Sequence, residues 1–396
     1  MCDPVSVLEP GELVRVSGPD PARGPGWFRG VRRLAGCAGR AIASASDWVF
    51  GAVALTIGLS ILASAPVAQF LAFGYLLEAG GRVARSGRLR DGLVGVRKAS
   101  RIGSMVIGVC LFLLPLQLAS SLAISAQLVD PGGPVARRGK VGLVVLTVVV
   151  ALHILGACAR GGRLRHFLIP FGNPFWIARR WKQGGAYASA RDAVWDFVAS
   201  LRLGVYFRLG LLGFVGTMAW LAVPVSLIAA GRVAPILAVP GALLLGLVAL
   251  PLPFLQTQFV VGGRFADLFE LRAARGRFRR APWAFAFALA LTFLAALPLY
   301  LLKIEMIPRE TAWLPGLVFL AFIMPSRLMT GWAYARSSRR ELPRHWVFRW
   351  TGRIAVLPVV ALYVLIVFLS QYTAWRGVWS LYEQHAFLLP VPFLGM

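Results

Sequence analysis

Apolar runs of bilayer length are the feature that most constrains how this chain can fold. The hydrocarbon core of a membrane is about 30 Å thick, so a helix needs about 20 apolar residues to cross it. Backbone groups in lipid must pair within their own segment, so runs of this length cross as helices. The chain is 58% hydrophobic and 15% charged, whereas soluble domains carry about 25% charged residues. The sequence therefore predicts an all-α, polytopic helical membrane protein.

We place nine transmembrane helices on these runs. Residues 48–80 form one apolar stretch interrupted at Pro66, which fits either a tight helical hairpin or one span followed by a re-entrant segment. The predicted spans are 48–65, 66–81, 104–128, 141–158, 209–230, 233–261, 282–302, 313–334 and 354–372.

The distribution of basic residues supports this assignment. With a cytoplasmic N-terminus, 34 of the 42 lysines and arginines fall in the N-tail and the inner loops, seven fall in outer loops, and Arg327 lies within a span. Cytoplasmic loops of membrane proteins are enriched in Lys and Arg. A single crossing by residues 48–81 would place the large basic loops outside, so this region crosses twice or not at all. We predict two crossings and an N-in/C-out orientation.

The net charge of +26 does not indicate a nucleic-acid partner. Orientation already explains the basic loops, and no aromatic-basic module such as an RRM signature is present. We expect the loops to contact anionic headgroups of the inner leaflet, with the lipid bilayer as the main partner and protein partners left unidentified. The 38 arginines, four lysines and single asparagine suggest a GC-rich bacterial coding sequence, which predicts a bacterial cytoplasmic (inner) membrane.

A basic phrase recurs after spans that return to the cytoplasm. It reads ARSGRLR at 84–90, ARGGRLR at 159–165, ARGRFR at 274–279 and, in degraded form, ARSSRR at 335–340. Two four-span repeats of the same orientation plus one extra span would explain this recurrence, since units with an even number of spans are parallel repeats. Convergence is the alternative, because inward-ending helices of an Arg-rich chain tend to finish in small and basic residues.

This internal repeat defines the predicted domain organisation. An amphipathic linker with helical spacing separates the two halves, and we expect it to lie on the inner leaflet. Residues 386–394 are too short and too rich in proline to span, so we expect them to pack back at the outer surface. The predicted segments are an N-tail with a basic amphipathic stretch (1–47), membrane repeat 1 (48–165), the cytoplasmic linker (166–208), membrane repeat 2 (209–340), and the last span with an outer C-terminal tail (341–396).

Motifs that carry chemistry are missing from the sequence. It contains no P-loop, no HExxH zinc helix and no GxSxG nucleophile elbow. Its four cysteines and four histidines show no metal-ligand spacing. We therefore expect neither a metal nor a cofactor, name no catalytic residues, and predict that the chain is not an enzyme.

Polar side chains within predicted spans are the candidate functional positions, because such groups are costly in lipid. Arg327 is the sharpest, with snorkelling or carbonyls freed by Pro325 as its structural alternatives. Gln69 and Gln256 each follow a proline, where an exposed half-helix N-terminus attracts anions. Hydrogen bonding to a neighbouring helix is the simpler interpretation of both glutamines.

Three further ionisable positions lie near the inner ends of predicted helices. Glu78 can pair with Arg82 at i,i+4, and Glu270 faces several arginines, so both suit ion pairs at the inner rim. His153 suits packing better than a proton relay.

The stretch Phe70–Arg90, with Gly74-Tyr75-Leu76-Leu77 leading into the Gly-Arg phrase, resembles a broad group of uncharacterised bacterial polytopic membrane proteins. In that group a GYLL-type helix ends in arginines. The final third of the chain, from Ala281, looks like relatives of the same kind. The resemblance implies a helical membrane architecture and carries no established activity.

Three functions are compatible with these features. The repeat, the proline-broken helices and Arg327 suit a transporter or permease for a small or lipidic solute. The lack of site motifs suits a non-catalytic membrane scaffold or assembly protein. A lipid-modifying membrane enzyme is the third hypothesis, and no motif supports it.

Overall fold

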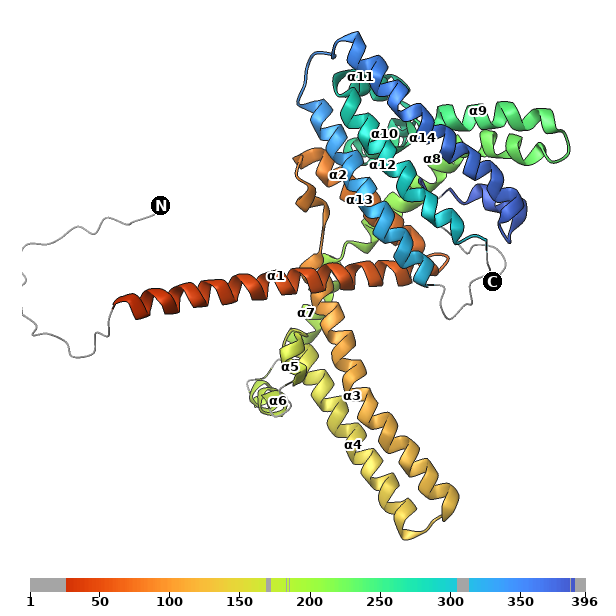
Figure 1. The fold of residues 1–396 in the computed structure, drawn as a ribbon. Helices are drawn as coiled ribbons and strands as arrows, with labels where there is room; N and C mark the ends of the chain where they lie inside the picture. Colours follow the sequence, from red (N-terminus) through yellow and green to blue (C-terminus); the bar gives the residue numbers. More distant parts are fainter. Residues whose placement is uncertain are drawn as a thin grey trace, which may run out of the picture. The chain divides into compact units, whose positions relative to one another are not determined.

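The computed structural model describes residues 26–168, 172–182, 184, 186–304, 313–384 and 386–388, and every regular element in these ranges is a helix. The first α-helices are α1 (Gly26–Ser64), α2 (Gln69–Ser86), α3 (Val96–Val129), α4 (Pro134–Ala159), α5 (Leu164–Leu168), α6 (Gly172–Lys182) and α7 (Ala186–Ser200). They are followed by α8 (Leu203–Ala230), α9 (Ala238–Ala249), α10 (Leu252–Gly262), α11 (Leu271–Arg280), α12 (Pro282–Leu301), α13 (Trp313–Ser338) and α14 (Trp346–Thr373). Short 3-10 helices are η1 (Leu89–Gly92), η2 (Pro235–Leu237), η3 (Phe265–Phe269) and η5 (Gly377–Tyr382) (Figure 1).

Residues 1–49 and residues 50–396 form separate compact units. In the first unit, the described residues 26–49 all belong to α1, so the predicted amphipathic stretch of the N-tail is helical. The second unit contains the remainder of α1 and the other helices, and the contacts below belong to it.

Seven helical segments of the described chain are long and apolar enough to cross a membrane, and the number rises to eight if the bent pair α9–α10 is one span. This architecture is that of a polytopic helical membrane protein. The predicted span 66–81 is not among these segments. The seven are Ser44–Ser64, Val96–Val129, Pro134–Ala159, Val194–Ala230, Pro282–Leu301, Trp313–Ser338 and Trp346–Thr373.

Helix α2 fails the apolar criterion because its 18 residues include Glu78, Arg82 and Arg85, and it is enclosed by protein. It packs against α8, α13 and α10, and Leu76 and Ala79 have no exposed surface. A helix in this position needs small residues for close approach more than lipid-facing apolar ones. Gly80 allows α13 to approach α2 closely. A Cβ added to Gly80 would lie 2.9 Å from the carbonyl oxygen of Arg327 on α13.

Helices α3 and α4 have the opposite environment. They run side by side as an antiparallel pair (Figure 1), yet only 11% and 22% of their most apolar windows are buried, against 61% for α12. Leu114, Leu118 and Leu122 on α3 are all more than half exposed. Apolar surface of this extent is stable against lipid tails and costly in water.

The sixth predicted span is a broken helix. Segment Pro235–Ala249 and α10 meet at an angle of 41°, and Pro251 lies at the junction, immediately before α10. Proline removes a backbone donor and clashes with the preceding turn, which breaks a helix at this point. Gln256 is thereby placed in the second turn of a new helix.

The recurring basic phrase has a backbone counterpart, although not in the register that the sequence suggests. Helices α2 and α10 both end at a left-handed glycine, Gly87 with φ 73° and Gly263 with φ 76°. Each is followed by an extended arginine, Arg88 or Arg264, and then by a 3-10 helix. Residues 274–279 lie instead inside α11. The structural equivalence therefore pairs 87–91 with 263–267, and the third copy of the phrase is a helix rather than a turn.

Candidate functional site

Arg327 lies in the middle of α13 and is only 5% exposed. Its Nη1 donates to Oε1 of Gln256, and its Nη2 donates to the carbonyl oxygens of Phe387 at 2.9 Å and Ala386 at 3.4 Å. The guanidinium also lies 5.8 Å from the ring centre of Phe73 on α2, a distance at which the ring face attracts a cation. All of these partners are neutral. The carbonyls freed by Pro325, which the sequence suggested, are not among them.

Gln256 connects three parts of the bundle around this arginine. Its Nε2 donates to Oγ1 of Thr217 on α8 at 2.7 Å and to the carbonyl oxygen of Phe387 at 3.1 Å. Both amide hydrogens are thus used, while Oε1 accepts from Arg327. The expectation that Gln256 bonds a neighbouring helix is confirmed.

The chain after α14 turns back into the bundle to supply these acceptors. Ala386 and Phe387 have no exposed surface, and Leu388 is 2% exposed. The prediction that residues 386–394 pack at the outer surface is therefore wrong for the described part of that stretch, residues 386–388. The physical reason is that the buried donors of Arg327 and Gln256 need acceptors, and the carbonyls of the returning chain provide them.

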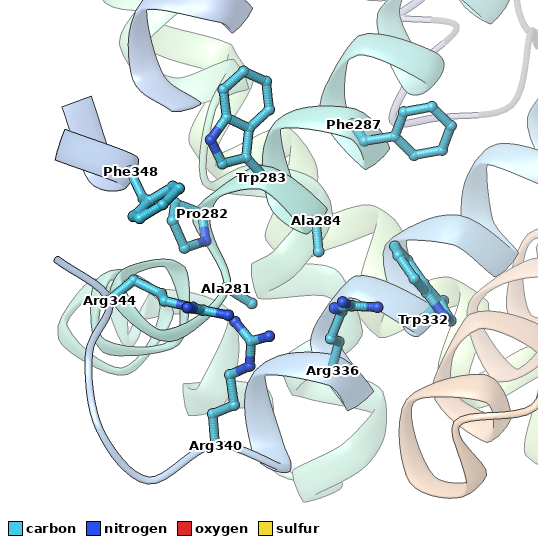
Figure 2. A pocket seen from close by; sticks show the side chains of 10 residues that line it. All are labelled: Ala281, Pro282, Trp283, Ala284, Phe287, Trp332, Arg336, Arg340, Arg344 and Phe348. Carbon is cyan, nitrogen blue, oxygen red and sulfur yellow. The ribbon is translucent and has the colours of Figure 1, made fainter. Parts of the chain in front are cut away.

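The structure contains a cavity of about 430 Å³ that lies away from Arg327 (Figure 2). Its lining comes from the start of α12, the end of α13 with the loop that follows, and the start of α14, and it includes neither Arg327, Gln256 nor Gln69. Arg327, Gln256 and Gln69 are each at most 5% exposed, and none of them lines this cavity.

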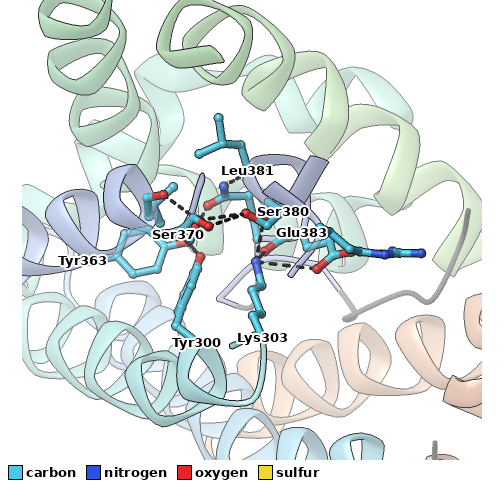
Figure 3. Close-up of polar contacts among 10 residues, drawn as sticks. Tyr300, Lys303, Tyr363, Ser370, Ser380, Leu381 and Glu383 are labelled. Carbon is cyan, nitrogen blue, oxygen red and sulfur yellow. Dashed lines mark hydrogen bonds and ion pairs between the residues drawn. The ribbon is translucent and has the colours of Figure 1, made fainter. Parts of the chain in front are cut away.

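A second polar cluster holds the returning chain where α12 and α14 end (Figure 3). Nζ of Lys303 donates to the carbonyl oxygens of Ser380 and Glu383, each at 2.7 Å, and lies 3.7 Å from Oε2 of Glu383. Oε1 of the same Glu383 pairs with Arg376 at 2.7 Å. Burial lowers the pKa of Lys303 from 10.5 to about 8, although the neighbouring Glu383 carboxylate opposes this change.

Hydroxyl contacts continue this cluster inward. The Tyr363 hydroxyl donates to Oε1 of Gln384 at 2.7 Å, and the Ser380 hydroxyl lies 3.0 Å from the carbonyl oxygen of Ser370. Sequence reasoning missed this cluster. The available signal was a carboxylate at Glu383 next to an otherwise apolar tail.

Gln69 and the two glutamates occupy separate places. Gln69 donates from Nε2 to the carbonyl oxygen of Pro66 within its own turn. The expectation that its amide bonds a neighbouring helix is therefore wrong, because the carbonyl oxygen three residues earlier accepts this donor. Glu78 pairs with Arg82 at 3.0 Å and with Arg85 at 2.8 Å, which confirms the predicted ion pair at i,i+4.

Glu270 lies after η3 rather than on α10. It accepts from Gln258 at 3.3 Å and lies 3.7 Å from Arg264, so one of the arginines expected around it is present.

His153 is a packing residue joined to the single asparagine of the chain. Its Nε2 lies 3.0 Å from the carbonyl oxygen of Phe167, and its Nδ1 lies 3.2 Å from Nδ2 of Asn173. A carbonyl can only accept and an amide nitrogen can only donate, so these contacts require the neutral ring with its proton on Nε2.

Asn173 extends this link between α4 and α6. It also donates to the carbonyl oxygen of His166 at 2.9 Å and accepts from Nη1 of Arg160 at 2.7 Å. Sequence reasoning did not single out this residue for a structural role, whereas it is a fully buried connection.

Within the described residues, no group of three His, Cys, Asp or Glu side chains could hold a metal ion. No family model, curated protein or solved structure matches this chain. The resemblance to bacterial polytopic proteins therefore stays a prediction.

Proposed function

We propose that this chain is a non-catalytic membrane scaffold or assembly protein. The observation that carries the proposal is the environment of Arg327. Its guanidinium and the amide of Gln256 bond to the chain's own C-terminal segment, and both side chains are almost fully buried. A solute path would need these groups to face a water-filled space, because polar groups that bind solutes at membrane depth line cavities.

The proposed layout is nine spans with the N-terminus inside. It requires α2 to cross in the same direction as α10 and α13. In support of this, Arg85 at the end of α2 donates to the carbonyl oxygen of Val260 at the end of α10, and Arg339 after α13 donates to that of Ser86. We name this side of the bundle, defined by Arg85, Val260 and Arg339, the basic end.

Contacts at the other side agree with the same layout. Ser226 near the end of α8 meets Tyr382 after α14, and Lys303 after α12 binds Ser380. Helices α8, α12 and α14 thus finish together, opposite the basic end. The excess of arginine in the loops of the basic end supports placing that end in the cytoplasm of a bacterium.

The two parallel repeats are part of the same proposal. The same succession of backbone conformations after α2 and after α10 supports them. In both places a left-handed glycine is followed by an extended arginine and then by a 3-10 helix. Asp91 and Asp267 occupy the same position in these turns, and each backbone N–H bonds to the carbonyl oxygen of the preceding arginine, Arg88 or Arg264.

A transporter is the second candidate, favoured by the break between α9 and α10. Broken helices near the middle of a membrane form substrate sites in secondary transporters, and Gln256 lies one turn beyond this break. In that case the C-terminal segment would have to leave Arg327 during each cycle.

Two measurements test the proposal. Wild-type and R327L protein are reconstituted in liposomes and assayed for small-solute flux and lipid flipping, and we expect no flux above empty liposomes. Flux that is abolished by R327L would overturn the scaffold proposal in favour of transport. In parallel, crosslinking in intact cells followed by gentle detergent extraction should yield a defined assembly heavier than the 42.9 kDa chain, and recovery of the lone chain would contradict it.

Topology is tested separately by labelling single cysteines introduced at exposed positions of the linker that precede the candidate span Val194–Ala230, such as Arg191 and Asp192. We expect membrane-impermeant reagents to label them only after the cells are opened. Labelling of intact spheroplasts would refute the N-in orientation.

A further inference from the structure

The 430 Å³ cavity has an arginine wall at the basic end. Ten residues line it, and they include Arg336, Arg340 and Arg344 and no acidic residue (Figure 2). Figure 2 shows the side chains of Arg340 and Arg344 meeting beside Ala281, with Arg336 across the opening. Three positive charges therefore surround one space of the size that ligand pockets have.

These charges lack the counterions that other arginines of the basic end have. Arg82 and Arg85 share the carboxylate of Glu78, whereas no described carboxylate lies within ion-pair distance of the three cavity arginines. Burial, together with the charges of Arg344 and Arg336, lowers the pKa of Arg340 from its ordinary value. Like charges held together without a carboxylate favour binding of an anion from outside the chain.

The arginines are held in place by the fold. Nη1 of Arg340 donates to the carbonyl oxygen of Arg280 at 3.4 Å, and the backbone N–H of Arg344 donates to that of Arg279 at 2.8 Å. The Arg336 guanidinium lies 5.3 Å from the ring centre of Trp332. The guanidinium of Arg340 is thus bonded to the end of α11, and those of Arg336 and Arg344 lie beside the rings of Trp332 and Phe348 at the same opening.

The opposite wall of the cavity is aromatic. Trp283 and Phe287, one helical turn apart on α12, are 51% and 55% exposed. Phe348 on α14 is 47% exposed and lies beside the arginines, with its ring centre 5.8 Å from the guanidinium of Arg344. Aromatic side chains at the end of a membrane helix suit the boundary between headgroups and acyl chains. A ligand of this cavity would therefore meet charge at one side and apolar surface at the other.

We propose that this cavity binds the phosphate of an anionic phospholipid, with the guanidinium groups on the phosphate and an acyl chain along Trp283 and Phe287. Guanidinium groups bind phosphate oxygens in pairs of parallel hydrogen bonds, and basic pockets between membrane helices accept anionic headgroups. A scaffold function does not require such a site, so this inference goes beyond it. The proposed orientation decides only which leaflet supplies the lipid.

The test uses the purified full chain in an uncharged detergent and native mass spectrometry. The protein is titrated with dimyristoyl phosphatidylglycerol or with dimyristoyl phosphatidylcholine. We expect one phosphatidylglycerol to be retained at least tenfold more strongly than phosphatidylcholine, and R336Q/R340Q/R344Q to lose this preference. The control R97Q/R272Q/R275Q removes the same charge from exposed positions outside the cavity and should keep it.

Two milder variants cover the case in which the triple variant does not fold. R340K keeps the charge but loses paired hydrogen bonding, and F287A shortens the aromatic wall; each should weaken phosphatidylglycerol retention several-fold. The proposal is overturned if wild type and the cavity variants retain phosphatidylglycerol equally. It is also overturned if the control R97Q/R272Q/R275Q loses the preference for phosphatidylglycerol as fully as the cavity variants do. Displacement of the lipid by millimolar inorganic phosphate would assign the site to free phosphate instead and overturn the lipid assignment.

Discussion

Gly74 on α2 and Gly210 on α8 lie backbone to backbone. A Cβ added to Gly74 would lie 1.8 Å from the carbonyl oxygen of Tyr206, and one added to Gly210 would lie 1.9 Å from that of Phe70. Neither oxygen can move without breaking its helix, so this crossing tolerates no side chain. It holds α2 against α8 in the packed part of the bundle.

We expect G74A and G210A each to destabilise the protein, because both variants force the two helices apart. Overpacking of this kind costs about 1–3 kcal/mol. Thermal unfolding in detergent, followed by size-exclusion chromatography, measures the effect. G58A and G142A are matched controls, since an added Cβ meets nothing within 4 Å at either position. Equal unfolding temperatures for G74A and G58A would refute the close crossing.

Arg327 should control access to the C-terminal segment. R327L removes the charged donor to Phe387 and Gln256, and hydrogen bonds of charged groups contribute about 1.5–3 kcal/mol each. In a variant whose four cysteines are replaced by serine, a cysteine at Leu388 should react with maleimide about tenfold faster when R327L is added. R336L on the same helix is the control, and an unchanged rate in R327L would show that the segment is held without Arg327.

Stability should depend on pH through Lys303. Its pKa is about 8 in the folded protein and 10.5 ordinarily, so between these values the unfolded chain binds more protons than the folded one. Unfolding free energy therefore rises with pH across this window. We measure the melting temperatures of wild type and K303M from pH 7 to about 10.5. The melting temperature of wild type should rise relative to that of K303M as the pH increases. A constant or falling difference would contradict the assigned burial of this amine.

Asn173 should stabilise the connection between α4 and α6. N173D retains an acceptor for Arg160 but loses the amide donor to His153 and to the carbonyl oxygen of His166. Buried acceptors left unpaired cost about 1–3 kcal/mol. Hydrogen exchange should therefore accelerate at residues 164–168 and 172–182. S125A, which removes only a local exposed hydrogen bond, should leave this exchange unchanged.

The polar candidates were found in the sequence because charged and amide groups are rare in apolar runs, yet their partners were not predictable. Arg327 and Gln256 are 71 residues apart, and nothing in the local pattern of either one indicates the other. Residues 386–388 read as a short apolar tail, and their backbone carbonyls leave no signature in the side chains. Contacts made by the backbone of a distant segment depend on the tertiary fold alone.

The sequence alone determined that the chain is helical and suited to a membrane, because the length and polarity of each run set how it can satisfy its backbone in lipid. It also indicated local pairs such as Glu78 with Arg82, whose spacing of one helical turn brings them together in any helix. Only the tertiary structure decided that α2 is enclosed by other helices and that the chain after α14 returns to Arg327. Only the fold, too, gathers Arg336, Arg340 and Arg344 around one cavity. These outcomes depend on which helix faces pack together, and that choice is made by shape and hydrogen-bond complementarity between segments far apart in sequence.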